Sequence, residues 1–259
     1  MAYVMLGRCE RLEDIYIAGD FDIGKIKASP EALIENQRIV NQFQSNLERR
    51  SFMTNCLRIS YLNVRSLGEH FQDVLASPDL MESTILAVAE TWLEPGQTIE
   101  LPQFPSDEAI FQGGGRGKGL AVFPKVSVMS KKYSAEGVSA VVIKLGDIIA
   151  AFLYLSSGVD WTMVTGMLDL WISSELPTVV MGDMNWHWDK DSQHPMQCQL
   201  AAKGFQQLIE DSTHDQGNCL DHIYANKKLL AMNPVVETQA NYFTDHDTIT
   251  LFLPEINMS

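Results

Sequence analysis

Apolar residues between positions 56 and 254 fall mostly into short runs with the length and composition of β-strands. Many runs are rich in β-branched and aromatic residues and are bounded by polar or glycine-containing segments. The chain is therefore strand-rich over most of its length. The pattern predicts strands at residues 56–63, 85–90, 119–123, 139–144, 148–155, 178–181, 220–224, 235–236 and 248–253.

Two segments between these strands repeat their apolar residues at helical spacing. Strands with interleaved helices predict two packed β-sheets covered by helices, an α/β sandwich. The apolar positions are Trp161, Val164, Leu168, Trp171 and Ile172 in the first helix, and Met196, Leu200, Phe205, Leu208 and Ile209 in the second.

Residues 1–50 differ in pattern from the rest of the chain. Residues 3–6 and 14–17 are short strand-like runs, and Ser29-Pro30 opens a helical segment in which Ser29 is the expected N-cap. The polar residues 41–55 are typical of a linker or a helix extension. The sequence therefore predicts two parts, residues 1–50 and residues 51–259.

The chain is strongly acidic, with a formal net charge of −14 at pH 7. Residues 1–50 contain 7 Lys/Arg against 8 Asp/Glu, and residues 51–259 contain 12 against 25. Proteins that bind nucleic acids usually present a basic face to the phosphates. The charge alone therefore favours a metal-binding enzyme or a protein–protein module.

Several features of the sequence argue against a membrane or secreted protein. No apolar run approaches the ~20 residues that a membrane helix needs. Residues 1–8 have no basic region before their short apolar run, as a signal peptide would have. The four cysteines form no CxxC pair and no disulfide-like framework. We therefore expect a nuclear or cytoplasmic location.

Polar and acidic residues stand where the predicted strands begin or end. Asn63, Glu90 and Asp183 each end a strand, Asp221 opens one, and Asp245-His246-Asp247 precedes the last. Taken singly, each has a simple structural explanation in a turn or a loop cap. Together, carboxylates, an amide and a histidine are what metal-assisted phosphodiester hydrolysis needs, because hard oxygen ligands hold Mg²⁺ and a carboxylate activates water.

Five segments, in order along the chain, resemble the signature blocks of the endonuclease/exonuclease/phosphatase superfamily. The nearest resemblance is to the apurinic-type endonuclease domains of LINE retrotransposons and Helitron-like (Helentron) transposons, over about residues 55–254. It implies a DNase I-like fold, a four-layer α/β sandwich of two packed mixed sheets flanked by helices. The segments are Leu62-Asn63-Val64-Arg65-Ser66-Leu67, Ala89-Glu90-Thr91-Trp92-Leu93, Gly182-Asp183-Met184-Asn185, Cys219-Leu220-Asp221-His222-Ile223-Tyr224 and Thr244-Asp245-His246-Asp247.

The resemblance implies a metal site for Mg²⁺ or Mn²⁺. Asn63 and Glu90 would hold the ion, with Glu90 as the direct carboxylate ligand. Asp245 would assist on the metal side.

The same resemblance implies five residues that act on the substrate. Asp183 would activate the attacking water and Asn185 would orient it. His246 would contact the scissile phosphate, and Asp221 would hydrogen-bond to His246 and fix its tautomer. Tyr154 falls where the family places a tyrosine near the phosphate, although Leu155-Ser156-Ser157-Gly158 replaces the proline-containing stretch that commonly follows it.

Residues 1–45 resemble a different family. Residues 3–8 and 12–17 are similar to the last conserved segment of Helitron-type helicases, in which Arg8 would be the arginine for ATP hydrolysis and Gly7 replaces the usual serine. A strand pair with a basic residue is the simpler alternative. No Walker A motif accompanies this segment. Residues 113–119 are rich in glycine, but Gln112 stands where that motif needs a glycine and Gly119 where it needs a Ser or Thr. A glycine-rich hairpin is therefore expected there.

Other polar and aromatic residues carry weaker signals. The spacing of His187, His194 and Cys198 fits no common zinc finger, so placement at the surface is favoured over a zinc site. Trp186 and Trp188 follow Asn185 closely and either stack on a base or pack in the interior.

Basic residues cluster in two places. Two interpretations stay open for them: contact with a DNA backbone, or exposure to solvent at the rim of a hairpin. The clusters are Arg116, Lys118, Lys125, Lys131 and Lys132, and Lys227-Lys228.

The sequence predicts an endonuclease of transposon origin that nicks DNA with Mg²⁺ or Mn²⁺. One alternative is a superfamily relative that acts on a phosphorylated lipid, inositol or nucleotide, which the acidity favours because fold does not fix substrate. A second is a binding or regulatory module that keeps the fold without activity. The presence of every expected catalytic residue argues against the second alternative.

Overall fold

The computed structural model describes residues 56–188, 190 and 193–254. They belong to the larger of two units into which the chain divides, Phe52–Ser259. The predictions for Arg8, for the two N-terminal strands and for the helix at Ser29 lie outside the described residues.

The described residues form two six-stranded β-sheets. The first contains β1 Cys56–Asn63, β2 Ile85–Ala89, β3 Ile110–Gln112, β4 Leu120–Pro124, β11 Val235–Gln239 and β12 Thr248–Pro254. The second contains β5 Met129–Ala135, β6 Val138–Leu145, β7 Ile148–Leu155, β8 Thr178–Asp183, β9 Phe205–Gln207 and β10 Asp221–Asn226.

Both sheets are mixed, as the sequence predicted. The strand order is β11-β12-β1-β2-β4-β3 in the first sheet and β5-β6-β7-β8-β10-β9 in the second. One neighbouring pair in each sheet is parallel, β1 with β2 and β7 with β8, and the remaining neighbours are antiparallel. The expected glycine-rich hairpin is confirmed, since residues 113–119 join the antiparallel strands β3 and β4.

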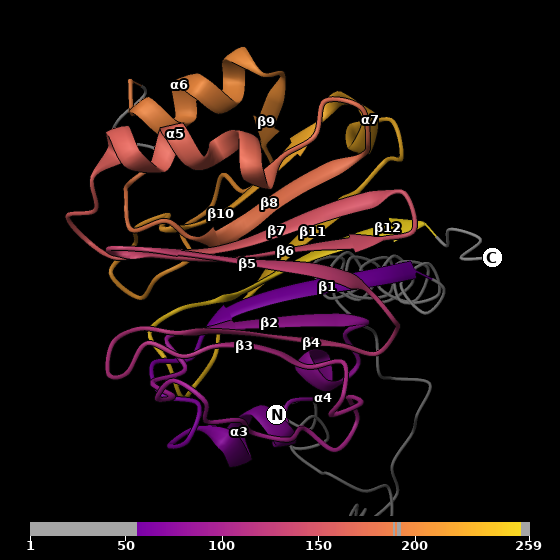
Figure 1. Ribbon diagram of the computed structural model, residues 1–259, viewed down its shortest axis with the longest axis vertical. Helices are drawn as coiled ribbons and strands as arrows, with labels where there is room; N and C mark the ends of the chain where they lie inside the picture. The colour runs from indigo at the N-terminus through magenta and orange to yellow at the C-terminus, as the bar shows by residue number, and fades with distance from the viewer. Residues whose placement is uncertain (1–55, 189, 191–192, 255–259) are drawn as a thin grey trace, which may run out of the picture. The chain divides into compact units, whose positions relative to one another are not determined.

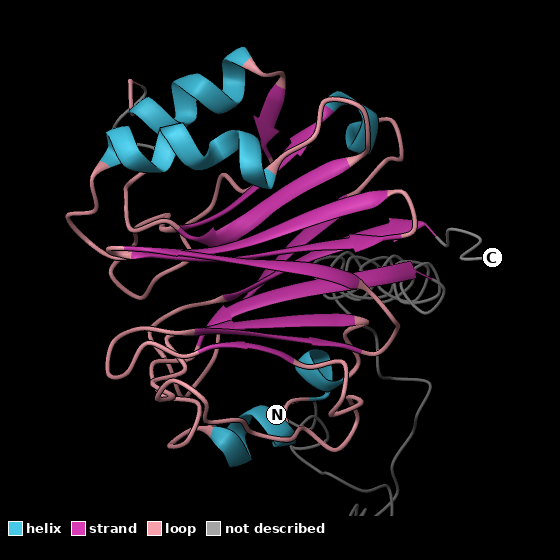
Figure 2. Cartoon of the chain, viewed as in Figure 1, coloured by secondary structure: helices cyan, strands magenta, loops and turns pink. Residues whose placement is uncertain are grey.

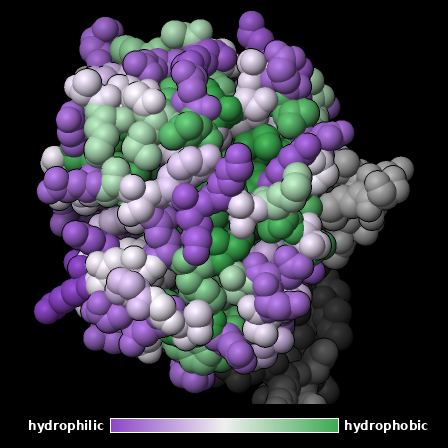
Figure 3. All heavy atoms as spheres, viewed as in Figure 1, coloured by the Kyte–Doolittle hydropathy of each residue, from purple (hydrophilic) through white to green (hydrophobic). Residues whose placement is uncertain are grey.

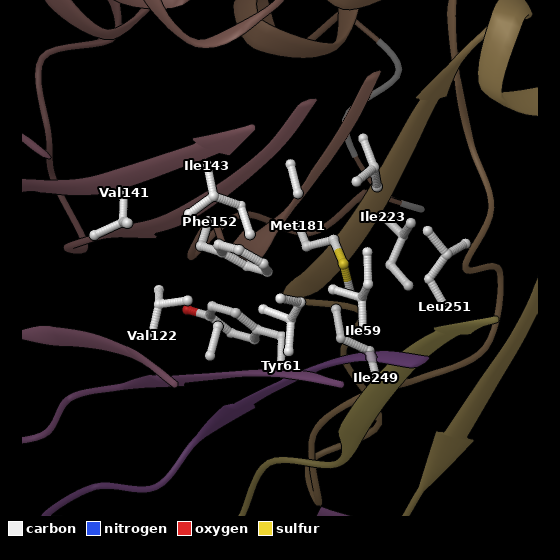
Figure 4. Packing of buried hydrophobic residues seen from close by; sticks show 14 of the residues in the cluster. Ile59, Tyr61, Val122, Val141, Ile143, Phe152, Met181, Ile223, Ile249 and Leu251 are labelled. Carbon is white, nitrogen blue, oxygen red and sulfur yellow. The ribbon is translucent and has the colours of Figure 1, made fainter. Parts of the chain in front are cut away.

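The two sheets pack face to face over an apolar core (Figure 4). Ile59 and Tyr61 from β1 meet Phe152 and Met181 from the second sheet, and all four are fully buried. The Tyr61 hydroxyl donates to the Leu153 carbonyl across the sheets at 2.8 Å. This bond satisfies a polar group that burial would otherwise leave unpaired, so it fixes the sheets relative to each other.

Helices cover the outer face of each sheet, which gives four layers (Figure 2). On the second sheet, α5 (Trp161–Trp171) and α6 (Pro195–Ala202) bury apolar side chains against β7 and β8. On the first, α3 (Phe71–Ala76) and α4 (Pro78–Met81) do the same against β1, β2 and β4. The predicted helix at 161–172 is confirmed and begins at the N-cap Asp160, whose side chain accepts from the Thr162 amide at 2.9 Å.

The second predicted helix is wrong over its C-terminal half. The α6 helix ends at Ala202, and Phe205–Gln207 is strand β9, which pairs with β10. Gly204, with φ of +81°, turns the chain between the two elements. Phe205 and Gln207 point inward and Gln206 points outward. This alternation is that of a strand, although the spacing of the apolar residues also fitted a helix.

The sequence also missed several elements that carry few apolar residues. Strand β5 is exposed over most of its length and forms the edge of its sheet, and β3 forms the edge of the other. Neither has the apolar run that marks a buried strand. The short helices α3, α4 and α7 (Lys227–Leu230) were not predicted either.

Candidate active site

The expected catalytic residues meet at one end of the two sheets, on the left in Figure 1. In the first sheet, β1 and β2 are parallel, so Asn63 and the residue after Ala89, Glu90, emerge at the same end. In the second, Asp183 ends β8 and lies directly opposite Asp221, which opens the antiparallel β10. Strand direction therefore places two polar residues at one end of each sheet, and the packing of the sheets brings the four together.

Gly182 permits the close packing that places Asp183. A Cβ at this position would lie 2.1 Å from the carbonyl oxygen of Leu153 on the neighbouring strand β7. No larger residue fits without moving the backbone of β7. The glycine is therefore present because the neighbouring strand packs closely against it, and the Gly-Asp pair lies within β8 instead of starting a turn.

Asn63 joins the two sheets through its side-chain amide. Its Nδ2 donates to Glu90 Oε1 at 3.0 Å and to Asp183 Oδ2 at 2.8 Å. Glu90 also accepts from the Tyr154 hydroxyl at 3.2 Å and from Trp92 Nε1 at 3.2 Å. The structure thus brings Asn63, Glu90, Asp183 and Tyr154 into one connected network, and Asn63 lies at its centre.

The backbone around Glu90 is strained. Glu90 and Trp92 have φ of 47° and 57°, and Arg65 and Ser66 have φ of 47° and 102°, although none is glycine. The amide of Ser66 donates to the carbonyl of Glu90 at 2.8 Å, so the two strained loops support each other. Strain of this kind persists only where the surroundings impose it, and it concentrates at ligand sites.

Asp183 is a buried carboxylate with its hydrogen bonds in place. Oδ1 accepts from the Asn185 amide at 3.0 Å, and the Asn185 side chain is held by a 2.8 Å bond to the Leu155 carbonyl. Burial, and then the nearby Asp221 carboxylate, raise the pKa of Asp183, and His246 lowers it. A buried carboxylate with a raised pKa is a stronger proton acceptor than a free one.

Asp221 and His246 form a direct pair, as the sequence predicted. His246 Nδ1 lies 2.8 Å from Asp221 Oδ2, and His246 Nε2 lies 4.0 Å from Asp183 Oδ2. Burial lowers the pKa of His246, but the charge of Asp221 and its hydrogen bond outweigh burial and raise the pKa to about 9. His246 therefore carries a proton at neutral pH, and its Nε2 points toward Asp183.

Asp245 lies beside this network and is held by two partners that the sequence did not indicate. Arg65 pairs with Asp245 Oδ2, and His214 Nε2 lies 3.4 Å from the same oxygen. The Arg65 amide donates to Asn63 Oδ1 at 3.1 Å, which links Asp245 to the rest of the site. His214 occupies a polar loop, and a backbone bridge to His246 brings it into place.

The donor set fits a divalent cation. Asp221 Oδ1 and Asp245 Oδ1 are buried and have no hydrogen-bond partner among the described residues. Two groups of side chains bring their ligand atoms within 4.8 Å of one another: Asp183 with Asp221 and His246, and His214 with Asp245 and His246. Neither group includes the expected ligand Glu90, and in both the carboxylates are available as ligands, whereas the protonated His246 ring has no lone pair to offer. Carboxylate oxygens with free lone pairs are the ligands that Mg²⁺ and Mn²⁺ prefer.

The histidines near Asn185 belong to no group of metal ligands found among the described residues. The groups of ligands close enough to share an ion, within the described residues, do not include His187, His194 or Cys198. The expected surface placement is wrong for His194, which is buried and stacks on Trp186 with ring centroids 4.0 Å apart. Trp186 also contacts Trp161 and is buried, so it packs in the interior.

The basic stretch at residues 116–132 does not form one surface. Arg116 and Lys118 lie in the hairpin between β3 and β4, at the catalytic end, where the Tyr154 hydroxyl donates to the Gly117 carbonyl at 2.9 Å. Lys125 is partly buried and donates to the carbonyl of Met81. Lys131 and Lys132 lie on strand β5, so within this basic stretch the hairpin cations Arg116 and Lys118 are the ones placed beside the site.

Two packed mixed sheets with carboxylates, an amide and a histidine at one end are the arrangement of the α/β-sandwich fold of nucleases and phosphatases. The profile of the Endonuclease/Exonuclease/phosphatase family matches residues 60–246, and the chain belongs to this family. The superfamily resemblance is confirmed by this match. The chain has no match among curated proteins.

Solved structures confirm the DNase I-like fold. An AP endonuclease from Archaeoglobus fulgidus is 17% identical with a TM-score of 0.59, over 76% of this chain and 99% of its own. The endonuclease domain of TRAS1, a telomere-specific non-LTR retrotransposon, is 12% identical with a TM-score of 0.56, over 78% and 100%. The 3′ phosphatase NExo from Neisseria, bound to a product DNA hairpin, is 15% identical with a TM-score of 0.52, over 76% and 99%.

Among the described residues, no helix combines the length and the apolar character needed to cross a membrane.

Proposed function

We propose that this chain is a divalent-metal-dependent endonuclease of transposon origin that nicks DNA in the nucleus or cytoplasm. The observation that carries the proposal is the network in which Asn63 joins Glu90 to Asp183, with the Asp221–His246 pair beside it. Residues 1–50 are, in this proposal, the remnant of a Helitron-type helicase.

Asn63, Glu90 and Asp245 are proposed to hold Mg²⁺ or Mn²⁺. The ion supplies positive charge that stabilises the additional negative charge on the phosphate during hydrolysis. Arg65 and His214 hold one oxygen of Asp245 and leave Oδ1 available. The Tyr154 and Trp92 bonds fix the orientation of the Glu90 carboxylate, one at each of its oxygens.

In the proposed hydrolysis a water oxygen bonds to phosphorus as the bond from phosphorus to the leaving oxygen breaks. Asp183 takes the proton of that water, which its raised pKa favours. Asn185 orients the water. Protonated His246 donates through Nε2 to the phosphate, since Nδ1 is engaged with Asp221. The leaving oxygen takes a proton from solvent.

A substrate comparison tests DNA against the phosphorylated lipids, inositols and nucleotides that the acidic composition favours. We expect Mg²⁺-dependent cleavage of plasmid and oligonucleotide DNA, and no comparable phosphate release from an inositol polyphosphate, a phosphoinositide vesicle or a nucleotide. Faster turnover of any of the last three would replace the DNA assignment. An absence of turnover on all substrates would favour a regulatory module with this fold.

We expect Asp221→Asn to shift the alkaline limb of the pH–rate profile toward neutral pH. His246 is protonated below its pKa of about 9, and Asp221 contributes most to raising this pKa against burial, ahead of Asp183 and Asp245. Without the anionic partner, burial remains and the proton is lost at lower pH. The pH–rate profile of Asp221→Asn, measured beside the parent, checks this. Asp211→Asn, which changes an exposed carboxylate in the segment between β9 and β10, is the control.

An unchanged alkaline limb in Asp221→Asn would show that protonation of His246 does not control the rate. Equal shifts in Asp221→Asn and Asp211→Asn would point to a general electrostatic effect instead.

We expect charge reversal of Arg116 and Lys118 to reduce the salt dependence of DNA binding. Both are exposed in the hairpin at the catalytic end. Each phosphate contact removed lowers the slope of log K against log salt by about one unit. The same reversal of Lys131 and Lys132, on the edge strand β5, is the control. A larger change in slope from the control pair would place the DNA along β5.

A further inference from the structure

A pocket adjoins the catalytic network, and its aromatic side chains have no role in the hydrolysis proposed above. It has a volume of about 410 Å³ and shares Arg65 and Asp245 with the catalytic network. The rest of its wall is largely aromatic. The lining residues are Arg65, His70, Trp92, Asp215, Tyr242, Phe243, Thr244 and Asp245.

Tyr242 presents an aromatic ring to solvent at this pocket. It is 80% exposed, and the other exposed large hydrophobic residues among those described, Met129 and Leu170, are not aromatic. Figure 3 shows that hydrophilic and hydrophobic side chains are interspersed over the face in view. An isolated exposed side chain needs no explanation, but an exposed ring at the rim of a pocket beside a catalytic network does.

The Tyr242 ring is held in place although it is exposed. Its hydroxyl donates to Asp73 Oδ1 at 2.8 Å. Its ring meets the edge of Phe243 at a centroid distance of 5.2 Å, and Phe243 in turn contacts His70 at 5.6 Å. The ring is therefore preorganised, and stacking of a ligand on it costs little additional conformational entropy.

Trp92 supplies a second ring on the catalytic side of the pocket. Its Nε1 bond to Glu90 fixes the indole, and its left-handed φ of 57° turns the backbone out of the extended conformation after β2. The Arg116 guanidinium lies 5.3 Å from the ring centroid. Trp92 therefore links this pocket directly to the proposed metal ligand Glu90.

The charges of the pocket disfavour a second phosphate as its occupant. Arg65 is the one arginine or lysine among the described residues that line it, while Asp215 and Asp245 both contribute carboxylates. Arg65 is already paired with Asp245. A flat, uncharged ring fits aromatic walls of this kind better than an anion does, because every nucleobase has a face that stacks on Trp or Tyr.

We infer that this pocket binds an unpaired nucleobase of the substrate strand, next to the scissile phosphate. The inference rests on the proposed action on DNA. A base inside a duplex has both faces covered by its neighbours, so only an unstacked base can contact Tyr242 and Trp92. The preferred substrate is therefore DNA with at least one unpaired base beside the cut, such as a bubble, a gap or a flap.

The test uses the full chain and a DNA bubble in which 2-aminopurine occupies each unpaired position in turn. The fluorescence of 2-aminopurine falls when its ring stacks. All proteins in this test also carry Asp183→Asn, so that the DNA strand is not cut in Mg²⁺ while binding is measured. Tyr242→Ala removes the ring, Tyr242→Phe keeps the ring and removes the bond to Asp73, and Leu170→Ala is a matched exposed truncation on α5.

We expect quenching at one position, its loss in Tyr242→Ala, and its retention in Tyr242→Phe and Leu170→Ala. Affinity for the bubble should fall roughly 5- to 100-fold in Tyr242→Ala, the range expected for one stacked base. Affinity for continuous duplex should stay unchanged. Binding of the bubble without quenching at any position, or quenching that persists in Tyr242→Ala, would overturn the inference and leave nicking intact. Failure of the parent to bind or nick any DNA would overturn the proposed function, and this inference with it.

Discussion

Replacing Asp183 with asparagine should lower the rate of DNA nicking by about 10²–10⁴-fold, the usual contribution of a general base. The substitution keeps the size of the side chain and removes its ability to take a proton from water. One of the bonds that Asp183 accepts from Asn63 and Asn185 is also weakened, because the new amide group is a donor. The rate of plasmid nicking at saturating Mg²⁺ measures the loss.

The same substitution should stabilise the metal-free protein. The pKa of Asp183 is raised by burial and by Asp221, so its charged form destabilises the fold at pH values above the unfolded pKa. The asparagine side chain is neutral at every pH, so we expect Asp183→Asn to have a higher Tm than the parent at neutral pH in EDTA. Asp147→Asn is the control, since Gly146-Asp147 has the same residue pair in an exposed turn. Near-parental turnover of Asp183→Asn would remove its assigned role.

Replacing Glu90 with glutamine should move the Mg²⁺ dependence of nicking to higher concentration, by at least about 10- to 100-fold. Glutamine keeps the length of the side chain and removes the negative charge that holds the ion. It also places an amide donor where Glu90 now accepts from Asn63, Tyr154 and Trp92. The Mg²⁺ concentration at half-maximal rate measures this effect.

Glu100→Gln removes an exposed carboxylate from the same stretch of chain and serves as the control for Glu90→Gln. Metal binding measured by calorimetry separates a loss of the ion from a loss of chemistry. If Glu90→Gln nicks as fast as the parent at limiting Mg²⁺, Glu90 is not the principal ligand.

The residues of the candidate site could be identified in the sequence because they stand at strand ends and in segments that resemble a known family. Asn63, Glu90 and Asp183 end buried strands whose apolar runs are plain in the sequence, and Asp221 opens another. Parallel and antiparallel pairing then brings them to one end of the sheets without any information on side-chain contacts. Most of the strand-rich architecture follows from the same runs.

The partners of Asp245 could not be predicted in the same way. Arg65 is separated from Asp245 by 180 residues along the chain, and no local pattern marks their pairing. His214 sits in a loop and reaches Asp245 through a backbone bridge to His246. Contacts of this kind depend on loop conformations, which hydrophobic periodicity does not specify.

The error at residues 196–209 has a different cause. Phe205 and Ile209 lie four residues apart, as on one face of a helix, while Phe205 and Gln207 alternate inward as in a strand. Gly204 ends the helical segment and its left-handed backbone redirects the chain. Pairing with β10 then decides the conformation, which is a tertiary effect that overrides the local pattern.

Nicking of supercoiled plasmid with and without Mg²⁺ tests the central claim most directly. The full chain should convert supercoiled DNA to the open circular form in Mg²⁺, and EDTA should abolish the conversion. Asp183→Asn, purified in the same way, should be nearly inactive, which excludes a contaminating nuclease. Supercoiled plasmid that stays intact with the folded parent in Mg²⁺ and in Mn²⁺, or equal nicking by parent and Asp183→Asn, would contradict the account.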